Sequence, residues 1–217
     1  MMKKVAVILS GCGVFDGAEI HESVLTLLNI ERHGASYQCF APDIEQLHVI
    51  NHLNGEVMAE KRNVLVEAAR IARGEIKDLK MLDVNEFDAL ALPGGFGAAK
   101  NLCDFALKGE NCDINDDVKS ACTAFLNAQK PAAYICIAPA LIPQIYPQGT
   151  LATIGTDVDT ASAVRNLGAE HKNCAVDEIV IDDAAKVIST PAYMLADNIS
   201  EAATGIEKAI AKLIAMS

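Results

Sequence analysis

The chain has 217 residues, 51% of them hydrophobic, and a formal net charge of −11 at pH 7. This length suits one ordinary domain with a full core, so we expect a single domain over residues 1–217. The acidic charge disfavours binding to nucleic acid or to an anionic membrane surface, because both are negatively charged. The seven cysteines are odd in number and form no C-x-x-C pair, which disfavours a disulfide framework and a zinc site.

The N-terminal segment predicts a buried strand, a Gly-containing loop and a helix. Val5–Leu9 is an apolar, largely β-branched run followed by a loop with two glycines. This run is too short for a signal peptide or a membrane span, and together with the unpaired cysteines it indicates a cytoplasmic protein. A helix follows over residues 18–32, and its apolar stripe consists of Ile20, Val24, Leu27 and Leu28.

The rest of the chain continues to alternate strands with helices. Strands are predicted over Ser36–Ala41, Phe87–Leu92, Ala132–Ile135 and Thr150–Ile154, and a hairpin over Ile179–Asp182 and Lys186–Thr190. Helices are predicted over Arg62–Arg73, 116–129, Ala161–Leu167 and 199–214. Residues 43–60 have no clean period and read as a loop over the body that is a candidate lid. The alternation predicts an α/β fold with a mostly parallel sheet.

Three distinctive loops follow predicted strands and are expected to meet at one edge of the sheet: Ser10–Gly17, Pro93–Gly97 and Cys136–Pro139. Cys136 lies between a buried strand and a helix. A sharp turn there exposes the side chain, the helix N-terminus favours a thiolate, and the next backbone N–H is free to bind an oxyanion. Cys136 is therefore the first candidate for a reactive thiol, although an apolar-flanked cysteine is more often a core residue. Cys12, beside two glycines, is the second candidate.

The pair Gly94-Gly95 comes directly after a predicted strand. Glycines let the backbone approach a ligand closely and direct N–H groups at it. The same pair also suits a tight turn without a ligand, so the pattern alone leaves both interpretations open.

The chain resembles the ThiJ/PfpI superfamily, which is related to class I glutamine amidotransferases. The resemblance is carried by Leu92–Leu102 (LPGGFGAAKNL), Ala132–Ile142 (AAYICIAPALI) and Val176–Met194. SGCGVFDGAEIHE, INHLNGE and TIGTD resemble the subgroup of ElbB-type glyoxalases, also called enhancing lycopene biosynthesis or sigma cross-reacting proteins. The resemblance implies a flavodoxin-like three-layer sandwich with a mostly parallel central sheet and a nucleophile elbow.

The family pairs its reactive cysteine with a glutamate of the first helix. Counting back from the glycine that ends this helix, the matching carboxylate is Glu22, and Glu19 is the alternative. By helical phase Glu22 lies opposite Ile20 and Val24, which favours a solvated position. A carboxyl group that shares a proton with Cys136 must instead be partly buried and have a raised pKa.

Many relatives carry a histidine about twenty residues after the cysteine, where this chain has Gly155-Thr156-Asp157. This departure disfavours a Cys-His dyad and with it peptidase activity. Asp157 stays a candidate for an orienting role. No motif places any of the histidines that remain candidates, which are His21, His48, His52 and His171.

The resemblance implies a glyoxalase that needs neither a cofactor nor a metal and acts on a small reactive aldehyde. The Cys136 thiolate adds to glyoxal, or more weakly to methylglyoxal, with the oxyanion held by the backbone N–H groups of Gly95 and Ile137. Glu22 moves a proton between the adjacent carbons, and water releases glycolate or lactate. Apparent deglycase activity would follow from the same chemistry. A homodimer and a link to isoprenoid biosynthesis are also implied by the resemblance.

Two other functions remain open. In a redox or stress-responsive protein with chaperone or regulatory output, Cys136 would oxidise to a sulfinic acid stabilised by Glu22. Glutaminase-like amide hydrolysis would also suit an elbow cysteine beside a Gly-Gly loop. The missing downstream histidine disfavours this last reading.

Overall fold

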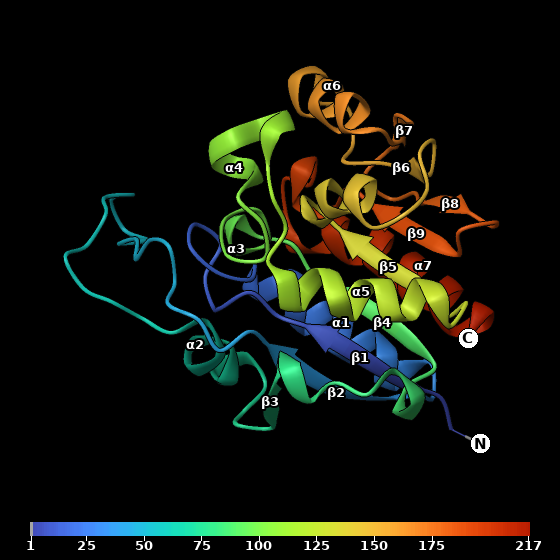
Figure 1. Cartoon of the computed structure of the whole chain (residues 1–217), viewed down its shortest axis with the longest axis horizontal. Coiled ribbons are helices and arrows are strands. Elements are labelled where there is room, and N and C mark those ends of the chain that lie inside the picture. The colour runs from blue at the N-terminus through green and yellow to red at the C-terminus, as the bar shows by residue number, and fades with distance from the viewer. Residues whose placement is uncertain (1) are drawn as a thin grey trace.

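The computed structural model describes residues 2–217 and is built around a seven-stranded sheet of order β3-β2-β1-β4-β5-β9-β8 (Figure 1). Five of its six strand pairs are parallel and only β8–β9 is antiparallel. The predicted mostly parallel sheet and C-terminal hairpin are thus confirmed. The strands are β1 (Lys4–Ile8), β2 (Ser36–Ala41), β3 (Ile76–Asp78), β4 (Ala89–Leu92), β5 (Ala132–Ile135), β8 (Val180–Asp182) and β9 (Val187–Thr190).

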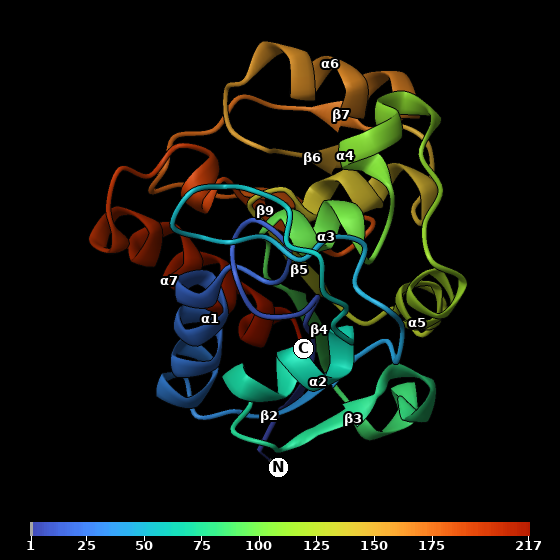
Figure 2. The same ribbon diagram turned by 90° about the vertical axis from the view of Figure 1, so that its left-hand side faces the viewer.

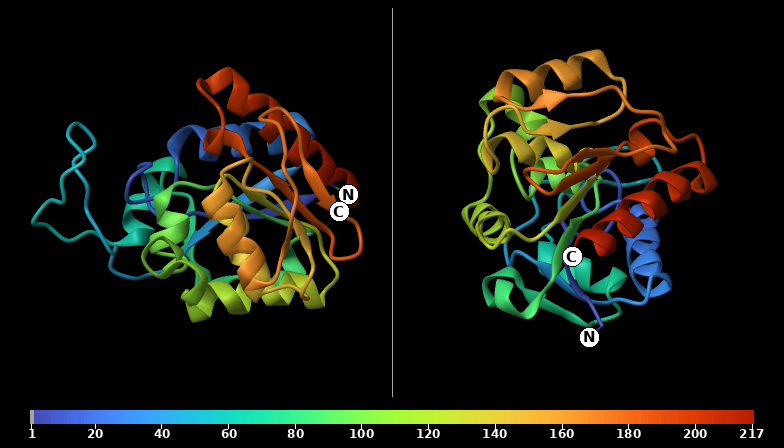
Figure 3. Two further views of the ribbon diagram at one scale, coloured as in Figure 1. Left: turned by 90° about the horizontal axis from the view of Figure 1, so that it is seen from above. Right: turned by 90° about the vertical axis from the view of Figure 1, so that its right-hand side faces the viewer.

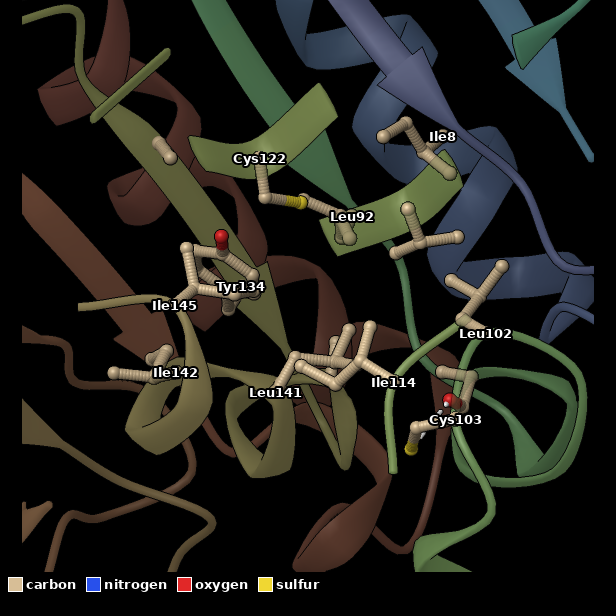
Figure 4. Close-up of a cluster of buried hydrophobic side chains, with 14 of the residues drawn as sticks. Ile8, Leu92, Leu102, Cys103, Ile114, Cys122, Tyr134, Leu141, Ile142 and Ile145 are labelled. Carbon is tan, nitrogen blue, oxygen red and sulfur yellow. Dashed lines mark hydrogen bonds between the residues drawn. The ribbon is translucent and has the colours of Figure 1, made fainter. Parts of the chain in front are cut away.

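Helices cover both faces of the sheet and complete a three-layer sandwich. Along β1, Val5 and Val7 join one hydrophobic cluster while Ala6 and Ile8 join another, because successive side chains of a strand point to opposite faces. The first cluster is covered by α1 (Ile20–Arg32), α2 (Val64–Ile71) and α7 (Ile199–Met216). The second cluster, which contains Ala6 and Ile8, is covered by α5 (Asp116–Asn127) and by the chain segments before and after this helix (Figure 2). Its side chains from strand, helix and loop interdigitate around Tyr134 (Figure 4).

A smaller layer lies beyond the main sheet. The segment predicted as a strand over Thr150–Ile154 forms only β6 (Leu151–Ala152), which pairs in parallel with β7 (Glu170–His171) outside the seven-stranded sheet. Helix α6 (Val158–Leu167) packs beside this two-stranded sheet (Figure 1). The predicted strand is thus present but shorter than expected, and it pairs locally instead of entering the main sheet.

The buried face of α1 differs from the predicted apolar stripe. Ile20, Val24 and Leu28 are 43%, 49% and 36% exposed, and of the predicted stripe only Leu27 is buried. The face toward the sheet carries polar side chains instead, namely Glu22, Ser23, Thr26 and Asn29. Local hydrogen bonds satisfy part of this polar face, since Ser23 and Asn29 donate to backbone carbonyls of their own helix and its cap, whereas Thr26 Oγ1 and Asn29 Oδ1 are buried without a partner.

The arm over residues 43–60 projects from the body at its residues 51–60, whereas Gln46 and Val49 nearer its start are buried (Figure 3). It is closed on itself by an antiparallel bridge between Ile50 and Val57, and Asp16 accepts a hydrogen bond of 2.7 Å from the Ile50 N–H at its base. Within residues 2–217, no helix has both the length and the apolar character needed to cross a membrane.

Candidate active site

Cys136 sits on a sharp turn directly after β5. Its φ angle is 61°, in the left-handed region that a residue with a Cβ adopts at a cost of about 1–2 kcal/mol. The turn is held by the Cys136 N–H, which donates to the Thr190 carbonyl at the end of β9 over 2.9 Å. The chain then continues into the predicted helix, which is a 3₁₀ helix, η4 (Ala138–Gln144), with proline in its first turn. This backbone geometry is that of a nucleophile elbow.

The three loops expected to meet at one sheet edge do meet there. The Phe96 N–H donates to the Val14 carbonyl and the Gly97 N–H to the Gly17 carbonyl, both over 2.8 Å. These bonds join the loop after β1 to the loop after β4, beside the elbow at the end of β5. The carboxyl ends of parallel strands thus form the site, as in other open α/β sheets.

Glu22 is fully buried and lies against the thiol of Cys136. Its Oε2 accepts a hydrogen bond of 2.9 Å from the Gly94 N–H and its Oε1 one of 3.2 Å from the Tyr193 N–H. The carboxyl group and the Cys136 thiol lie on either side of Gly94 and are close enough to alter each other's pKa. Burial raises the pKa of Glu22 to about 7, although these hydrogen bonds oppose the increase. A carboxyl group with this pKa exchanges a proton readily at neutral pH.

Glu19 occupies a different position from Glu22. It is the N-cap of α1, and its Oε2 accepts a hydrogen bond of 2.6 Å from the Glu22 N–H. Its side chain also lines the cavity in front of Cys136. Of the two glutamates that the sequence left open, Glu22 contacts the sulfur and Glu19 holds the start of the helix that carries it.

The environment of Cys136 does not favour a free thiolate. Burial raises the pKa of the thiol well above its usual range, and the neighbouring Glu22 raises it further. The N–H groups of Gly95 and Ile137 act on the sulfur in the opposite direction. The expectation that the turn by itself lowers this pKa is wrong, because burial of the thiol, and after it the neighbouring carboxyl group, outweigh the backbone donors. The thiol therefore ionises readily only when Glu22 takes up the proton.

Gly94 and Gly95 are required by close packing at the site. A Cβ on Gly94 would lie 2.5 Å from the Cys136 Cβ and 2.8 Å from Glu22 Oε2. A Cβ on Gly95, whose φ is 90°, would lie 2.3 Å from the Glu19 backbone nitrogen. The pair is thus more than a turn, since the absence of a Cβ lets this loop backbone approach the thiol and the two glutamates closely.

Cys136 opens into a cavity of about 400 Å³ that ends at the elbow. The sulfur-bearing residue is only 6% exposed, so this cavity is its route to solvent. The walls come from the loop after β1, α3 (Phe96–Lys100), α4 (Phe105–Lys108), the start of α6 and η5 (Ala192–Met194). No residue of the arm 43–60 lines the cavity within residues 2–217, so the segment is not a lid in this conformation.

Tyr193 is a residue of the site that sequence reasoning did not single out. It lines the cavity, its backbone N–H donates to Glu22, and its hydroxyl lies 2.8 Å from His21 Nδ1. It falls inside the segment Val176–Met194 that carries the resemblance, but its type and spacing gave no separate signal. Of the four candidate histidines, all within residues 2–217, His21 is the one that is hydrogen-bonded to a residue of the cavity wall, Tyr193.

Other candidate residues lie elsewhere. Asp157 is exposed and is the N-cap of α6, where its Oδ1 accepts a 2.8 Å hydrogen bond from the Thr160 N–H. Of the part of the chain that is described, the cavity wall includes Thr160 but not Asp157 or Cys12. The orienting role considered for Asp157 is therefore not supported by its position. Residues 2–217 contain no cluster of three or more His, Cys, Asp or Glu suited to a metal ion.

The fold and the elbow define the class, an amidotransferase-like fold shared with ThiJ/PfpI and DJ-1 proteins. No family model matches the chain. An isoprenoid biosynthesis protein with an amidotransferase-like domain from Ehrlichia chaffeensis is 38% identical with a TM-score of 0.89, covering 98% of this chain and 99% of that one. Drosophila melanogaster DJ-1beta has a TM-score of 0.57 at 18% identity over 100% of this chain and 92% of its own, a likeness of fold alone.

Two mammalian proteins show the family more narrowly. The ES1 protein homolog, mitochondrial, of Rattus norvegicus is 42% identical over 224 residues, covering 99% of this chain and 84% of the relative. The human glutamine amidotransferase-like class 1 domain-containing protein 3, mitochondrial, is also 42% identical over 224 residues, covering 99% and 83%. The chain therefore belongs to the family of ES1 and glutamine amidotransferase-like class 1 domain proteins.

The names of these relatives correct one expectation. The rat and human proteins and a Danio rerio ES1 protein, 36% identical over 207 residues, are all named as mitochondrial. These names conflict with the purely cytoplasmic location inferred from the sequence. That inference rested on a short N-terminal apolar run and unpaired cysteines, neither of which distinguishes one reducing compartment from another.

Proposed function

We propose that the protein is a cofactor-independent glyoxalase that converts glyoxal to glycolate and, more weakly, methylglyoxal to lactate. The observation that carries the proposal is the pair formed by the Cys136 thiol and the buried Glu22 carboxyl at the end of a cavity. A nucleophile beside a base whose pKa of about 7 matches neutral pH is the arrangement that covalent aldehyde chemistry requires.

In the first step, Cys136 Sγ attacks one aldehyde carbon of glyoxal while the Glu22 carboxylate takes the thiol proton. The carbonyl oxygen becomes an oxyanion beside the N–H groups of Gly95 and Ile137, the same groups that act on the sulfur. Protonation of this oxygen gives a hemithioacetal. Because thiol ionisation is coupled to proton uptake by Glu22, no free thiolate has to persist in the buried site.

In the second step, Glu22, which has passed the thiol proton to the hemithioacetal oxygen, removes the hydrogen of the hemithioacetal carbon as a proton. The hydroxyl proton of that carbon moves to the neighbouring carbonyl oxygen, which gives an enediolate. Glu22 then returns a proton to the neighbouring carbon, which leaves a thioester of glycolate on Cys136. Water hydrolyses the thioester and releases glycolate and the free thiol. The net reaction adds one water to glyoxal, so it consumes no oxidant or reductant.

The direct test is glycolate formation from glyoxal in the absence of glutathione. The wild-type protein is expected to form glycolate, and Cys136→Ser is expected to lose at least a hundredfold in kcat/KM, on the scale of removing a covalent nucleophile. Cys12→Ser is the matched control, because it removes a thiol outside the cavity. Wild-type turnover in Cys136→Ser would refute the proposal.

A redox role is the second candidate, and the same pair supports it. A Glu22 carboxyl that still holds its proton can donate a hydrogen bond to a sulfinate on Cys136. Mass spectrometry after mild peroxide tests this role. Two added oxygens on Cys136 in a protein without aldehyde turnover would favour it over the glyoxalase.

We also propose that the protein is a homodimer. The exposed apolar side chains Ile20, Val24 and Leu28 support this, because they lie one turn apart on the outer face of α1. Light scattering is expected to give twice the chain mass. A dimer that persists unchanged in Val24→Glu would show that this face is not the contact, and a monomeric wild-type protein would refute the dimer.

A further inference from the structure

The cavity in front of Cys136 is larger and more apolar than glyoxal requires. Glyoxal has four non-hydrogen atoms, whereas about 400 Å³ is within the range of cavities that hold much larger ligands, about 300–1,000 Å³. Beyond the thiol, most of the wall is hydrocarbon, with Val14, Phe96, Phe105, Ile137 and Met194 among its residues. Bound glyoxal would leave this wall facing water, which is unfavourable for apolar surface.

The charges around the cavity are one-sided. Of residues 2–217, those lining the cavity include no lysine, arginine or histidine, while Glu19 contributes a carboxyl group to the wall. The second carboxyl group, Glu22, lies directly behind Cys136. Lys100 lies outside this lining, with its Nζ 5.0 Å from the centroid of the Phe96 ring. A substrate with its own carboxylate would enter a poorly solvated space beside acidic groups and without a cation in the wall to pair with, which is costly.

From these two observations we propose that the site selects uncharged α-oxoaldehydes that carry an apolar substituent of about the size of a phenyl ring. The substituent packs between Phe96, Phe105 and Met194 while the aldehyde carbon reaches Cys136. This inference rests on the proposed glyoxalase function and names its substrate class. Glyoxal is then a small, poorly bound member of that class, and an aryl α-oxoaldehyde that carries a carboxylate on its ring is excluded.

The two aromatic residues occupy complementary positions in this arrangement. Phe105 opens α4 and is 9% exposed, so its ring is a fixed part of the wall. Phe96 opens α3 directly after Gly95 and is 48% exposed, so it lies toward the mouth. An aryl group between two such rings gains ring-to-ring contact in addition to the removal of apolar surface from water.

The test compares kcat/KM for phenylglyoxal, its para-carboxylate derivative and glyoxal, with the rate of Cys136→Ser subtracted at each concentration. Phenylglyoxal is expected to exceed glyoxal by about tenfold or more, the factor that the burial of one aromatic ring supplies, and the para-carboxylate derivative is expected to fall below phenylglyoxal by about tenfold or more. Met194→Lys places a cation in the wall and is expected to narrow the gap between the para-carboxylate derivative and phenylglyoxal by about tenfold. Met81→Lys, an equal change of charge at an exposed site outside the cavity, is the matched control.

A second measurement tests which ligands the cavity prefers and does not depend on turnover of any aldehyde. Alkylation of Cys136 by iodoacetanilide, iodoacetamide and iodoacetate is followed by mass spectrometry, and each rate is divided by the rate with glutathione. The expected order is aryl amide first, small amide second and carboxylate last, with about tenfold between the first two.

The two measurements separate the failure of this inference from the failure of the proposed function. If glyoxal is turned over but neither phenylglyoxal nor iodoacetanilide reacts faster than its small counterpart, the inference is wrong and the glyoxalase stands. If no aldehyde is turned over but the order of alkylation holds, the glyoxalase is wrong and the cavity still selects apolar, uncharged ligands.

Discussion

The stability of the protein is expected to fall as the pH rises through the range in which the buried Glu22 ionises. Burial raises the pKa of this carboxyl group from 4.5 to about 7. The folded chain therefore binds more protons than the unfolded chain between these values, so the free energy of unfolding decreases with pH in this window. At 1.36 kcal/mol per pH unit, ionisation of Glu22 is expected to remove about 3 kcal/mol by about pH 8.

The substitution Glu22→Gln isolates this contribution from all other titrating groups. The amide does not ionise, so the free energy of unfolding of the variant relative to wild type is expected to shift in the variant's favour by about 3 kcal/mol between about pH 4 and pH 8. The amide also directs an NH₂ group at the N–H of Gly94 or Tyr193, and this mismatch lowers the variant's stability at every pH. The change with pH, and not the absolute difference, is therefore the quantity of interest.

Urea denaturation followed by circular dichroism at a series of pH values measures this change. Glu31→Gln, which removes an exposed carboxylate from the same helix, is the matched control. If the difference between Glu22→Gln and wild type stays constant to within about 0.5 kcal/mol across the range, the reasoning about a buried, protonated Glu22 is refuted.

Three further substitutions test separate parts of the account. Gly94→Ala is expected to lower the free energy of unfolding by about 1–3 kcal/mol, because its Cβ would meet the Cys136 Cβ at 2.5 Å, and an unchanged melting temperature would contradict this. Asp157→Ala removes the N-cap of α6 and is expected to lower the free energy of unfolding by about 1 kcal/mol while glyoxal turnover is retained. A tenfold loss of kcat in this variant would show that Asp157 does act in catalysis. Cys12→Ser is expected to retain turnover on glyoxal, and its inactivation would mean that the wrong thiol has been assigned.

The features that were predictable from the sequence are those with a local cause. The runs that became β1, β4 and β5 are continuously apolar because both of their faces are buried, and the helices between them require parallel pairing. The elbow was also predictable, because a cysteine between a buried strand and a proline-containing helical turn leaves the chain little choice of conformation.

The features that were not predictable depend on partners far away in the chain. Helical phase placed Glu22 on the surface, yet the helix buries it because backbone donors from Gly94 and Tyr193 satisfy its carboxyl group. The raised pKa of Cys136 likewise follows from tertiary structure, first from burial of the thiol and then from a carboxyl group on another element, so local turn geometry predicted the wrong sign of the shift.

The most direct test of the central claim, a proton-sharing pair of Cys136 and Glu22, is to capture the covalent intermediate. Glu22 is the base in both steps, so Glu22→Gln is expected to form the covalent adduct far more slowly than the wild-type protein. Acid quench of the wild-type protein during turnover of glyoxal, followed by peptide mass spectrometry, should locate one glycolyl thioester on Cys136, with none in Cys136→Ser and little in Glu22→Gln. Modification found only on lysine and arginine side chains, with glycolate still formed by Cys136→Ser, would contradict the account.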